Sequence, residues 1–155
     1  MSLEKATFAA GCFWGIEYKF SQIEGVINAT SGYTDGEKEN PNYKEVCTDT
    51  TGHAEAVLIE FDNEIISYEA LLDAFWGMHD PTQLNKQGPD VGSQYRSAIF
   101  YHSEDQHKQA LVSCKDAQSR FDKEIVTQIK AARKFWPAEE YHQKYFIKNG
   151  GSCAI

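Results

Sequence analysis

The sequence contains no long hydrophobic run, no internal repeat and no low-complexity tract. Its first ten residues carry Glu4 and Lys5 among few apolar residues, so we expect neither a secretory signal nor a membrane anchor there. Basic residues are also scarce, because 15 Lys and Arg against 23 Asp and Glu give a formal net charge of -8. Nucleic-acid binding requires clustered Lys and Arg. We therefore expect a cytoplasmic protein with neither nucleic acid nor membrane as a partner.

Closely spaced cysteines are missing as well. The four cysteines stand at positions 12, 47, 114 and 153, and no C-x-x-C pair exists. This spacing argues against a structural zinc site and against a thioredoxin-type redox motif. A disulfide framework is not expected in a chain of this size without a secretory signal. Each cysteine is therefore interpreted by itself.

The chain has the length of one ordinary domain. Its 155 residues are 41% hydrophobic, which is enough for a real core, and no linker divides them. We expect a single catalytic domain over residues 1–155, with a flexible C-terminal tail from about residue 149.

Hydrophobic periodicity predicts alternating strands and helices. Strands are expected over residues 5–10, 53–62, 93–102 and 124–132, and helices over 12–24, 67–79, 103–122 and from Pro137 onward. Residues 31–52 and 80–92 are rich in Gly, Asn and Pro and are predicted to be loops. This order indicates an α/β or α+β protein with helices packed on a sheet.

Cys12 stands where the first predicted strand meets the first helix, directly after Gly11. Free N–H groups and the positive end of the helix dipole stabilise a thiolate at such a place and lower its pKa. Cys12 is thus a candidate nucleophile. The alternative is a small buried hydrophobic residue under the first helical turn.

Two aromatic residues follow Cys12 directly. Phe13 begins the apolar stripe of the predicted helix, together with Ile16 and Phe20, which favours a place in the core. Trp14 lies off that stripe. A large ring beside a reactive thiol that the core does not need is best explained as a wall of an apolar substrate pocket.

Glu55 shares a strand face with Val57, Ile59 and Phe61. Burial on that face would raise the pKa of its carboxyl and keep it protonated near neutral pH, as a general acid requires. The alternative is a solvated strand end. The H-x-E pattern of His53 and Glu55 also occurs in zinc deaminases, but the P-C-x-x-C partner is missing, and His53 is interpreted as structural.

Three polar residues come from the predicted loops. Tyr43 and Tyr95 could bring phenol hydroxyls, which donate a hydrogen bond without carrying charge, toward a polar oxygen of a substrate. Asp90 and Tyr95 stand together in "GPDVGSQYR", where the second loop meets the following strand. By composition alone, each of the three also fits a surface or core-edge position.

The other cysteines differ in their surroundings. Cys114 falls on an apolar helix stripe with Ala110, Leu111 and Ala117 and is interpreted as structural. Cys153 follows two glycines and a serine near the C-terminus. It is either an inert tail thiol or a mobile resolving thiol that condenses with a sulfenic acid on Cys12. Cys47, in the predicted loop over residues 31–52, is a weaker candidate for the resolving thiol.

Six segments together resemble one family. They are "GCFWG", "SGYTDG", "NPNYKEVC", "TGHAEAV", "FWGMHDPTQLNKQGPDVGSQYRSAI" and "AEEYHQKYF", between Thr7 and Cys153. In this order they resemble the A-type peptide-methionine sulfoxide reductases. The resemblance implies an α+β fold, a ferredoxin-like α/β sandwich with a mixed sheet and long irregular loops. It also implies reduction of the S epimer of methionine sulfoxide, free or in proteins.

The resemblance further implies a role for each matching residue. Cys12 is the attacking thiol, and Phe13 and Trp14 hold the S-methyl group of the substrate. Glu55 delivers a proton to the sulfoxide oxygen. Tyr43 and Tyr95 hydrogen-bond that oxygen, and Asp90 supports the polar side of the pocket; this list completes the implied catalytic and substrate-binding set.

The implied cycle ends with sulfur chemistry alone. A sulfenic acid on Cys12 becomes a disulfide, with Cys153 as the expected resolving cysteine, and thioredoxin reduces that disulfide. No metal and no organic cofactor is expected. Only Ala154 and Ile155 follow Cys153, so the tail has no further cysteine to relay the disulfide.

Two other functions stay open at this point. A cysteine peroxidase or general thiol oxidoreductase would use hydrogen peroxide or glutathione disulfide better than methionine sulfoxide. A non-catalytic reader would bind oxidised methionine without consuming it.

Overall fold

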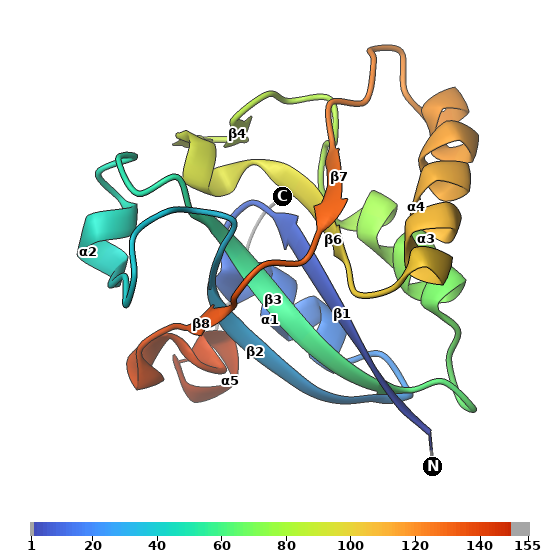
Figure 1. The fold of residues 1–155 in the computed structure, drawn as a ribbon, viewed down its shortest axis with the longest axis horizontal. Coiled ribbons are helices and arrows are strands. Elements are labelled where there is room, and N and C mark those ends of the chain that lie inside the picture. Colours follow the sequence, from blue (N-terminus) through green and yellow to red (C-terminus); the bar gives the residue numbers. More distant parts are fainter. Residues whose placement is uncertain (1, 150–155) are drawn as a thin grey trace.

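A six-stranded sheet organises the computed structural model, which describes residues 2–149 (Figure 1). The strand order is β7-β6-β1-β3-β2-β8, and all neighbours are antiparallel except the parallel pair β6 and β7. These strands are Leu3–Ala10 (β1), Val26–Thr34 (β2), Ala54–Asp62 (β3), Ser97–Tyr101 (β6), Gln128–Ala131 (β7) and Trp136–Pro137 (β8). Lys86–Gln87 (β4) and Asp90–Val91 (β5) form a separate small hairpin.

Helices lie on and beside this sheet. The α-helices are Phe13–Ser21 (α1), Tyr43–Val46 (α2), Tyr68–Met78 (α3), Glu104–Ala117 (α4) and Tyr145–Asn149 (α5), and the 3₁₀ turns are Ser93–Tyr95 (η1), Gln118–Arg120 (η2) and Glu140–His142 (η3). Helix α1 packs on β1, β2 and β3, whereas α3 and α4 pack on each other beside β1 and β6 (Figure 1). No helix within residues 2–149 combines the length and apolarity needed to cross a membrane.

The main core lies between the sheet and helices α1 and α3. Phe8 of β1 is fully buried and stacks on Phe20 of α1 and on Phe75 of α3, both at 5.2 Å between ring centroids. Alternate residues of β3 face the same core, and Val57, Ile59 and Phe61 are buried there. The carboxyl-bearing position 55 therefore falls on the face that α1 covers.

The other face of the sheet carries small residues. Ala9, Ala56 and Ala98 are buried there, and the segment that runs from β7 to β8 crosses over them (Figure 1). Phe135 of this segment packs on the alanine cluster. It comes so close to Gly32 of β2 that a Cβ atom there would lie 2.3 Å from the Phe135 ring. Small residues on this face thus let an irregular segment take the place of a helix.

The structure confirms the α+β class and several predicted boundaries. Helix α3 begins after Ser67, whose hydroxyl accepts the Ala70 N–H, and its apolar face is buried: Tyr68, Leu71, Leu72, Phe75 and Trp76. Helix α4 begins after Ser103, whose hydroxyl accepts the Gln106 N–H. Helix α1 is shorter than predicted and covers Phe13–Ser21.

The predicted loop over residues 31–52 is wrong at two places. Residues 31–34 belong to β2 and are buried, because their polar groups find distant partners: the hydroxyl of Ser31 donates to Glu17, and that of Thr34 to the Lys134 carbonyl. Residues 43–46 form α2, capped by the side chain of Asn42. Composition alone misses both, since the compensating contacts come from remote segments.

Other boundaries also differ from prediction. The predicted strand 93–102 begins only at Ser97, after a 3₁₀ turn, and the predicted helix 103–122 ends at Ala117. Pro137 does not open a helix. It pairs with Gly32 in the edge strand β8, where its missing N–H costs no ladder bond. Leu111, expected on the α4 stripe, is 50% exposed.

Candidate active site

Cys12 is the N-cap residue of α1, at the end of β1. Gly11 makes the turn with φ of 94°, and a Cβ atom there would lie 2.9 Å from the side chain of Gln87. Cys12 is partly exposed. The first-turn N–H groups of α1 and its dipole favour a negative charge at this place. The predicted strand-to-helix position of the thiol is confirmed.

Glu55 is buried and contacts the backbone of the residue that follows Cys12. Its side chain is 1% exposed, and its Oε1 atom accepts a hydrogen bond from the Phe13 N–H at 3.2 Å. Burial raises the pKa of Glu55 to about 8; the bond from Phe13 lowers this pKa in part, and the charge of Asp90 raises it further. The carboxyl is therefore mostly protonated at neutral pH. The solvated alternative for Glu55 is wrong.

Two phenols lie near this carboxyl. Burial, and next the charge of Glu55, raise the pKa values of both Tyr43 and Tyr95. The charges of Asp90 and Cys12 also raise the pKa of Tyr95. Both phenols therefore stay protonated and can donate a hydrogen bond. Five candidates from four separate segments thus lie around one site: Cys12, Tyr43, Glu55, Asp90 and Tyr95.

The two aromatic residues after Cys12 have different environments. Phe13 is 1% exposed, and its ring lies 5.7 Å from that of Tyr33 and 6.4 Å from that of Tyr43, so it belongs both to the core and to the site. Trp14 is only partly buried, and its ring stacks on Tyr145 of α5 at 3.9 Å. Trp14 therefore lies at the edge of the core, against which it packs, and contacts the C-terminal segment.

The sequence interpretation missed two side chains near the site. Glu139 accepts hydrogen bonds from the Tyr33 hydroxyl at 2.9 Å and from the Tyr43 N–H at 3.0 Å. His142 lies with its ring centroid 5.3 Å from that of Phe13 and 4.4 Å from that of Tyr43. Both residues belong to "AEEYHQKYF", but no periodic pattern in that segment marks them.

The remaining cysteines differ in exposure and in position. Cys47 caps the C-terminal end of α2 and is exposed. Cys114 is a free thiol on α4 that packs against the core, as a structural role predicts. Cys153, the predicted resolving cysteine, lies outside the described residues.

His53 is structural, as predicted. It is 2% exposed; its Nδ1 atom accepts the Gly36 N–H, and its Nε2 atom contacts the Lys38 carbonyl at 2.7 Å. Within residues 2–149, no group of three or more His, Cys, Asp or Glu side chains is arranged to hold a metal ion.

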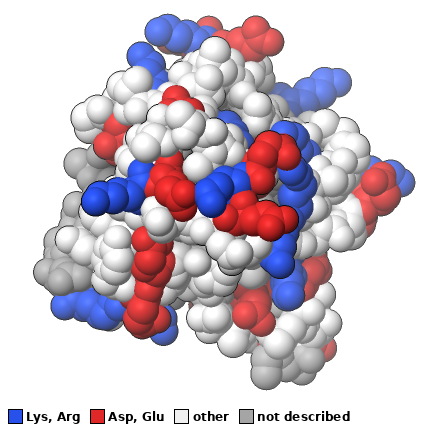
Figure 2. All heavy atoms as spheres, turned by 60° about the vertical axis from the view of Figure 1, so that its left-hand side comes forward, with Lys and Arg blue, Asp and Glu red and all other residues white. Residues whose placement is uncertain are grey.

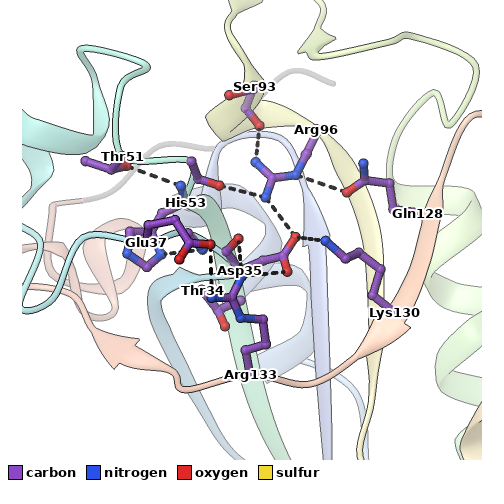
Figure 3. A network of polar contacts seen from close by, with 12 residues as sticks. Thr34, Asp35, Glu37, Thr51, His53, Ser93, Arg96, Gln128, Lys130 and Arg133 are labelled. Carbon is purple, nitrogen blue, oxygen red and sulfur yellow. Dashed lines mark hydrogen bonds and ion pairs between the residues drawn. The ribbon is translucent and has the colours of Figure 1, made fainter.

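A buried ion-pair network braces two segments of the site (Figure 3). The side chain of Asp35 is 2% exposed and meets Arg96 at 3.1 Å and Lys130 at 2.7 Å. The Arg96 guanidinium also donates to the carbonyls of Ser93 and Gly52. Arg96 thereby joins the turn that carries Tyr95 to the residues just before β3, which carries Glu55.

We expect the Asp35→Ala protein to be less stable than the native protein by about 3 kcal/mol, because it leaves the Arg96 charge buried without its carboxylate. Urea unfolding measures the difference. The matched control is Glu37→Ala, since the Glu37 side chain is 86% exposed and meets only the half-exposed Arg133 at 3.2 Å. That control is expected to cost less than about 1 kcal/mol. Equal losses of unfolding free energy in both variants would show that the buried Asp35–Arg96 pair stabilises the fold no more than the exposed Glu37–Arg133 pair.

The charged surface shows no broad basic area on the face drawn in Figure 2. Lys and Arg side chains lie there beside Asp and Glu side chains. This mixture agrees with the acidic composition.

Comparisons with known proteins agree on one family. The family model described as peptide methionine sulfoxide reductase matches residues 4–155. The peptide methionine sulfoxide reductase MsrA of Acidobacterium capsulatum is 55% identical over 156 residues, which cover 99% of this chain and all of that protein. Among solved structures, reduced Mxr1 from Saccharomyces cerevisiae has a TM-score of 0.93 at 35% identity, covering 99% of this chain and 89% of Mxr1. Mxr1 in complex with Trx2 matches with a TM-score of 0.68 at 23% identity, covering 98% and 86% of the two chains.

Proposed function

The chain belongs to the peptide methionine sulfoxide reductase family, and from this membership and the site we infer that it is an enzyme that reduces methionine sulfoxide to methionine. The single observation that carries the mechanism is the hydrogen bond between the Phe13 N–H and the buried Glu55 carboxyl. It fixes a proton donor next to the residue that follows Cys12. A thiol and an acid are thus held within reach of one small substrate.

We propose that the Cys12 thiolate attacks the sulfur of the bound sulfoxide. Glu55 gives its proton to the sulfoxide oxygen, which is a poor leaving group unless it is protonated. The oxygen passes to the sulfur of Cys12, so the products are methionine and a sulfenic acid. The raised pKa of Glu55 supports this role, because an acid with a pKa of about 8 still carries its proton at pH 7.

The other residues of the site orient the sulfoxide. We propose that Phe13 and Trp14 hold the S-methyl group and that the hydroxyls of Tyr43 and Tyr95 bond the oxygen. Neutral phenols stabilise charge on that oxygen without repelling the thiolate. Asp90 supports the polar side and helps to keep Glu55 protonated. We propose that the apolar wall, the oxygen donors and the attacking thiolate together select the S epimer.

Recycling requires a second thiol and an external dithiol. We propose that Cys153 condenses with the sulfenic acid on Cys12, releasing water and forming a disulfide, and Cys47 is the second candidate. Thioredoxin then reduces this disulfide. The relative Mxr1, which has been solved in complex with Trx2, supports a partner of this kind. No step of this cycle calls for a metal or an organic cofactor.

We also propose that residues 1–155 act as one catalytic domain in the cytoplasm. The six-stranded sheet, which takes strands from Leu3 to Pro137, supports a single unit. Cys47 and Cys114 are free thiols, which fits a reducing compartment.

An assay with separate S and R epimers of methionine sulfoxide, with dithiothreitol as reductant, tests the proposal. We expect the S epimer to be consumed and the R epimer to be left unchanged. Hydrogen peroxide and glutathione disulfide are assayed in parallel. If either oxidant is used faster than the S epimer, the protein is a general thiol oxidoreductase or peroxidase and the proposed function fails.

A further inference from the structure

His142 joins the indole ring of Trp14 to the rest of the site. It is 1% exposed, and its Nδ1 atom accepts a hydrogen bond from the indole Nε1–H of Trp14 at 2.9 Å. The same imidazole packs at 5.3 Å from the Phe13 ring and at 4.4 Å from the Tyr43 ring. One side chain therefore touches three of the aromatic residues that surround the proposed substrate.

The protonation state of His142 follows from this bond. An indole N–H can only donate, so Nδ1 must be the unprotonated nitrogen of a neutral imidazole. Burial lowers the pKa of His142, which favours the neutral form, although the charge of Glu139 acts in the opposite direction. The Nε2 atom is buried and has no hydrogen-bond partner within residues 2–149. In that part of the chain, the bond to Trp14 is thus the polar contact that orients the ring.

The residues after His142 are anchored to α1 and β2. The backbone N–H of Lys144 donates to both carboxylate oxygens of Glu17, at 3.0 and 2.8 Å, and Glu17 is 1% exposed. The Gln143 side chain accepts the Ser31 N–H at 2.9 Å and donates to the Ser31 carbonyl at 2.8 Å. These contacts hold the imidazole at a fixed place relative to the helix that begins at Cys12.

We propose that His142 is a positioning residue of the sulfoxide reduction. Its Nδ1 atom fixes the rotation of the Trp14 indole, and the fixed indole forms a rigid wall for the S-methyl group. The inference rests on the proposed function, in which Trp14 holds that group. A wall that serves substrate and transition state alike affects KM more than kcat.

The kinetic test compares two replacements of His142. His142→Phe keeps a ring but loses the acceptor, and we expect it to raise KM for a peptide methionine S-sulfoxide about tenfold with little change in kcat, as for the loss of one hydrogen bond. His142→Asn places an amide oxygen near the position of Nδ1 and should recover most of the loss. The matched control is His102→Phe, because His102 lies just after β6 and bonds Thr7. We expect native kinetics for it.

A spectroscopic test needs no activity. The indole N–H of Trp14 gives one ¹⁵N–¹H signal, identified by its loss in Trp14→Phe. We expect His142→Phe to shift this signal and to speed its exchange with solvent, and His142→Asn to restore the protection. A second control is His142→Phe in the Trp14→Phe background, where the indole donor is already absent and KM should not rise further.

An unchanged indole signal in His142→Phe would overturn the inference, and so would a shifted signal with unchanged KM. If His142→Phe fails to fold, the indole signal and the KM of His142→Asn decide. Faster exchange of the indole N–H together with a raised KM in His142→Asn would contradict the acceptor role. Failure of the proposed function looks different. A Cys12→Ser protein that stays active would refute that function and leave the Trp14 signal coupled to His142.

Discussion

The Cys12→Ser protein is expected to lose reduction of methionine S-sulfoxide by a factor on the order of 10⁴ or more, since a hydroxyl cannot take the place of the thiolate nucleophile. The structure explains why this residue matters. Cys12 caps α1, and the turn at Gly11, with φ of 94°, brings its thiol to the end of β1. Initial rates with the S epimer and dithiothreitol measure the loss.

Cys114→Ser is the matched control for this substitution. Cys114 is also partly buried, but it lies on α4 and packs against the core. We expect its rate to stay within twofold of the native rate. Normal turnover in Cys12→Ser would remove Cys12 from the reaction, and an equal loss of activity in Cys114→Ser would show that the effect is not specific to Cys12. Substrate binding without consumption by the native protein would favour the non-catalytic reader.

The second large effect is expected at Glu55. Glu55→Gln keeps an acceptor for the Phe13 N–H but has no acidic proton, and we expect kcat to fall by about 10²–10⁴. A general acid works only while protonated. Because the pKa of Glu55 in the folded, substrate-free protein is about 8, the native kcat/KM should decrease as the pH rises through that value. Rate profiles measured from pH 6 to pH 10 test both expectations.

Glu60→Gln is the control, because Glu60 lies on the same strand as Glu55 but an odd number of residues away, on the opposite face. It should keep the native rate and the native decrease above pH 8. In Glu55→Gln the decrease caused by this carboxyl should vanish. A native profile that stays flat through pH 9 would contradict Glu55 as the acid.

The same pKa shift predicts an effect on stability. The pKa of Glu55 is raised from 4.5 to about 8 on folding, so the folded state binds the extra proton between these pH values. Native stability should therefore fall as the pH rises through that window, by up to about 1.4 kcal/mol per pH unit. This part of the pH dependence should be missing in Glu55→Gln.

Short-range patterns predicted the centre of the site. The Gly11-Cys12 junction follows from a strand ending where a helical stripe begins, and the burial of Glu55 follows from its parity with Val57 and Ile59 on β3. Both depend on residues within a few positions of each other. Periodicity is therefore enough to find them.

Long-range contacts explain what the sequence could not indicate. Ser31 and Thr34 are polar and yet lie in a buried strand, because Glu17 and the Lys134 carbonyl satisfy them. His142 reaches Trp14 from 128 residues away. Such partners are set by the path of the segment after β8, and no local pattern in that segment records where it will pack.

The central claim is that the sulfur of Cys12 takes the oxygen of the substrate. Its most direct test is one turnover without any external dithiol, with methionine S-sulfoxide carrying ¹⁸O, in the presence of a reagent that traps sulfenic acids. The account predicts one methionine per protein and the trapped sulfenic acid on the peptide that contains Cys12. Methionine formed while this peptide stays unmodified, and outside any disulfide, would contradict it.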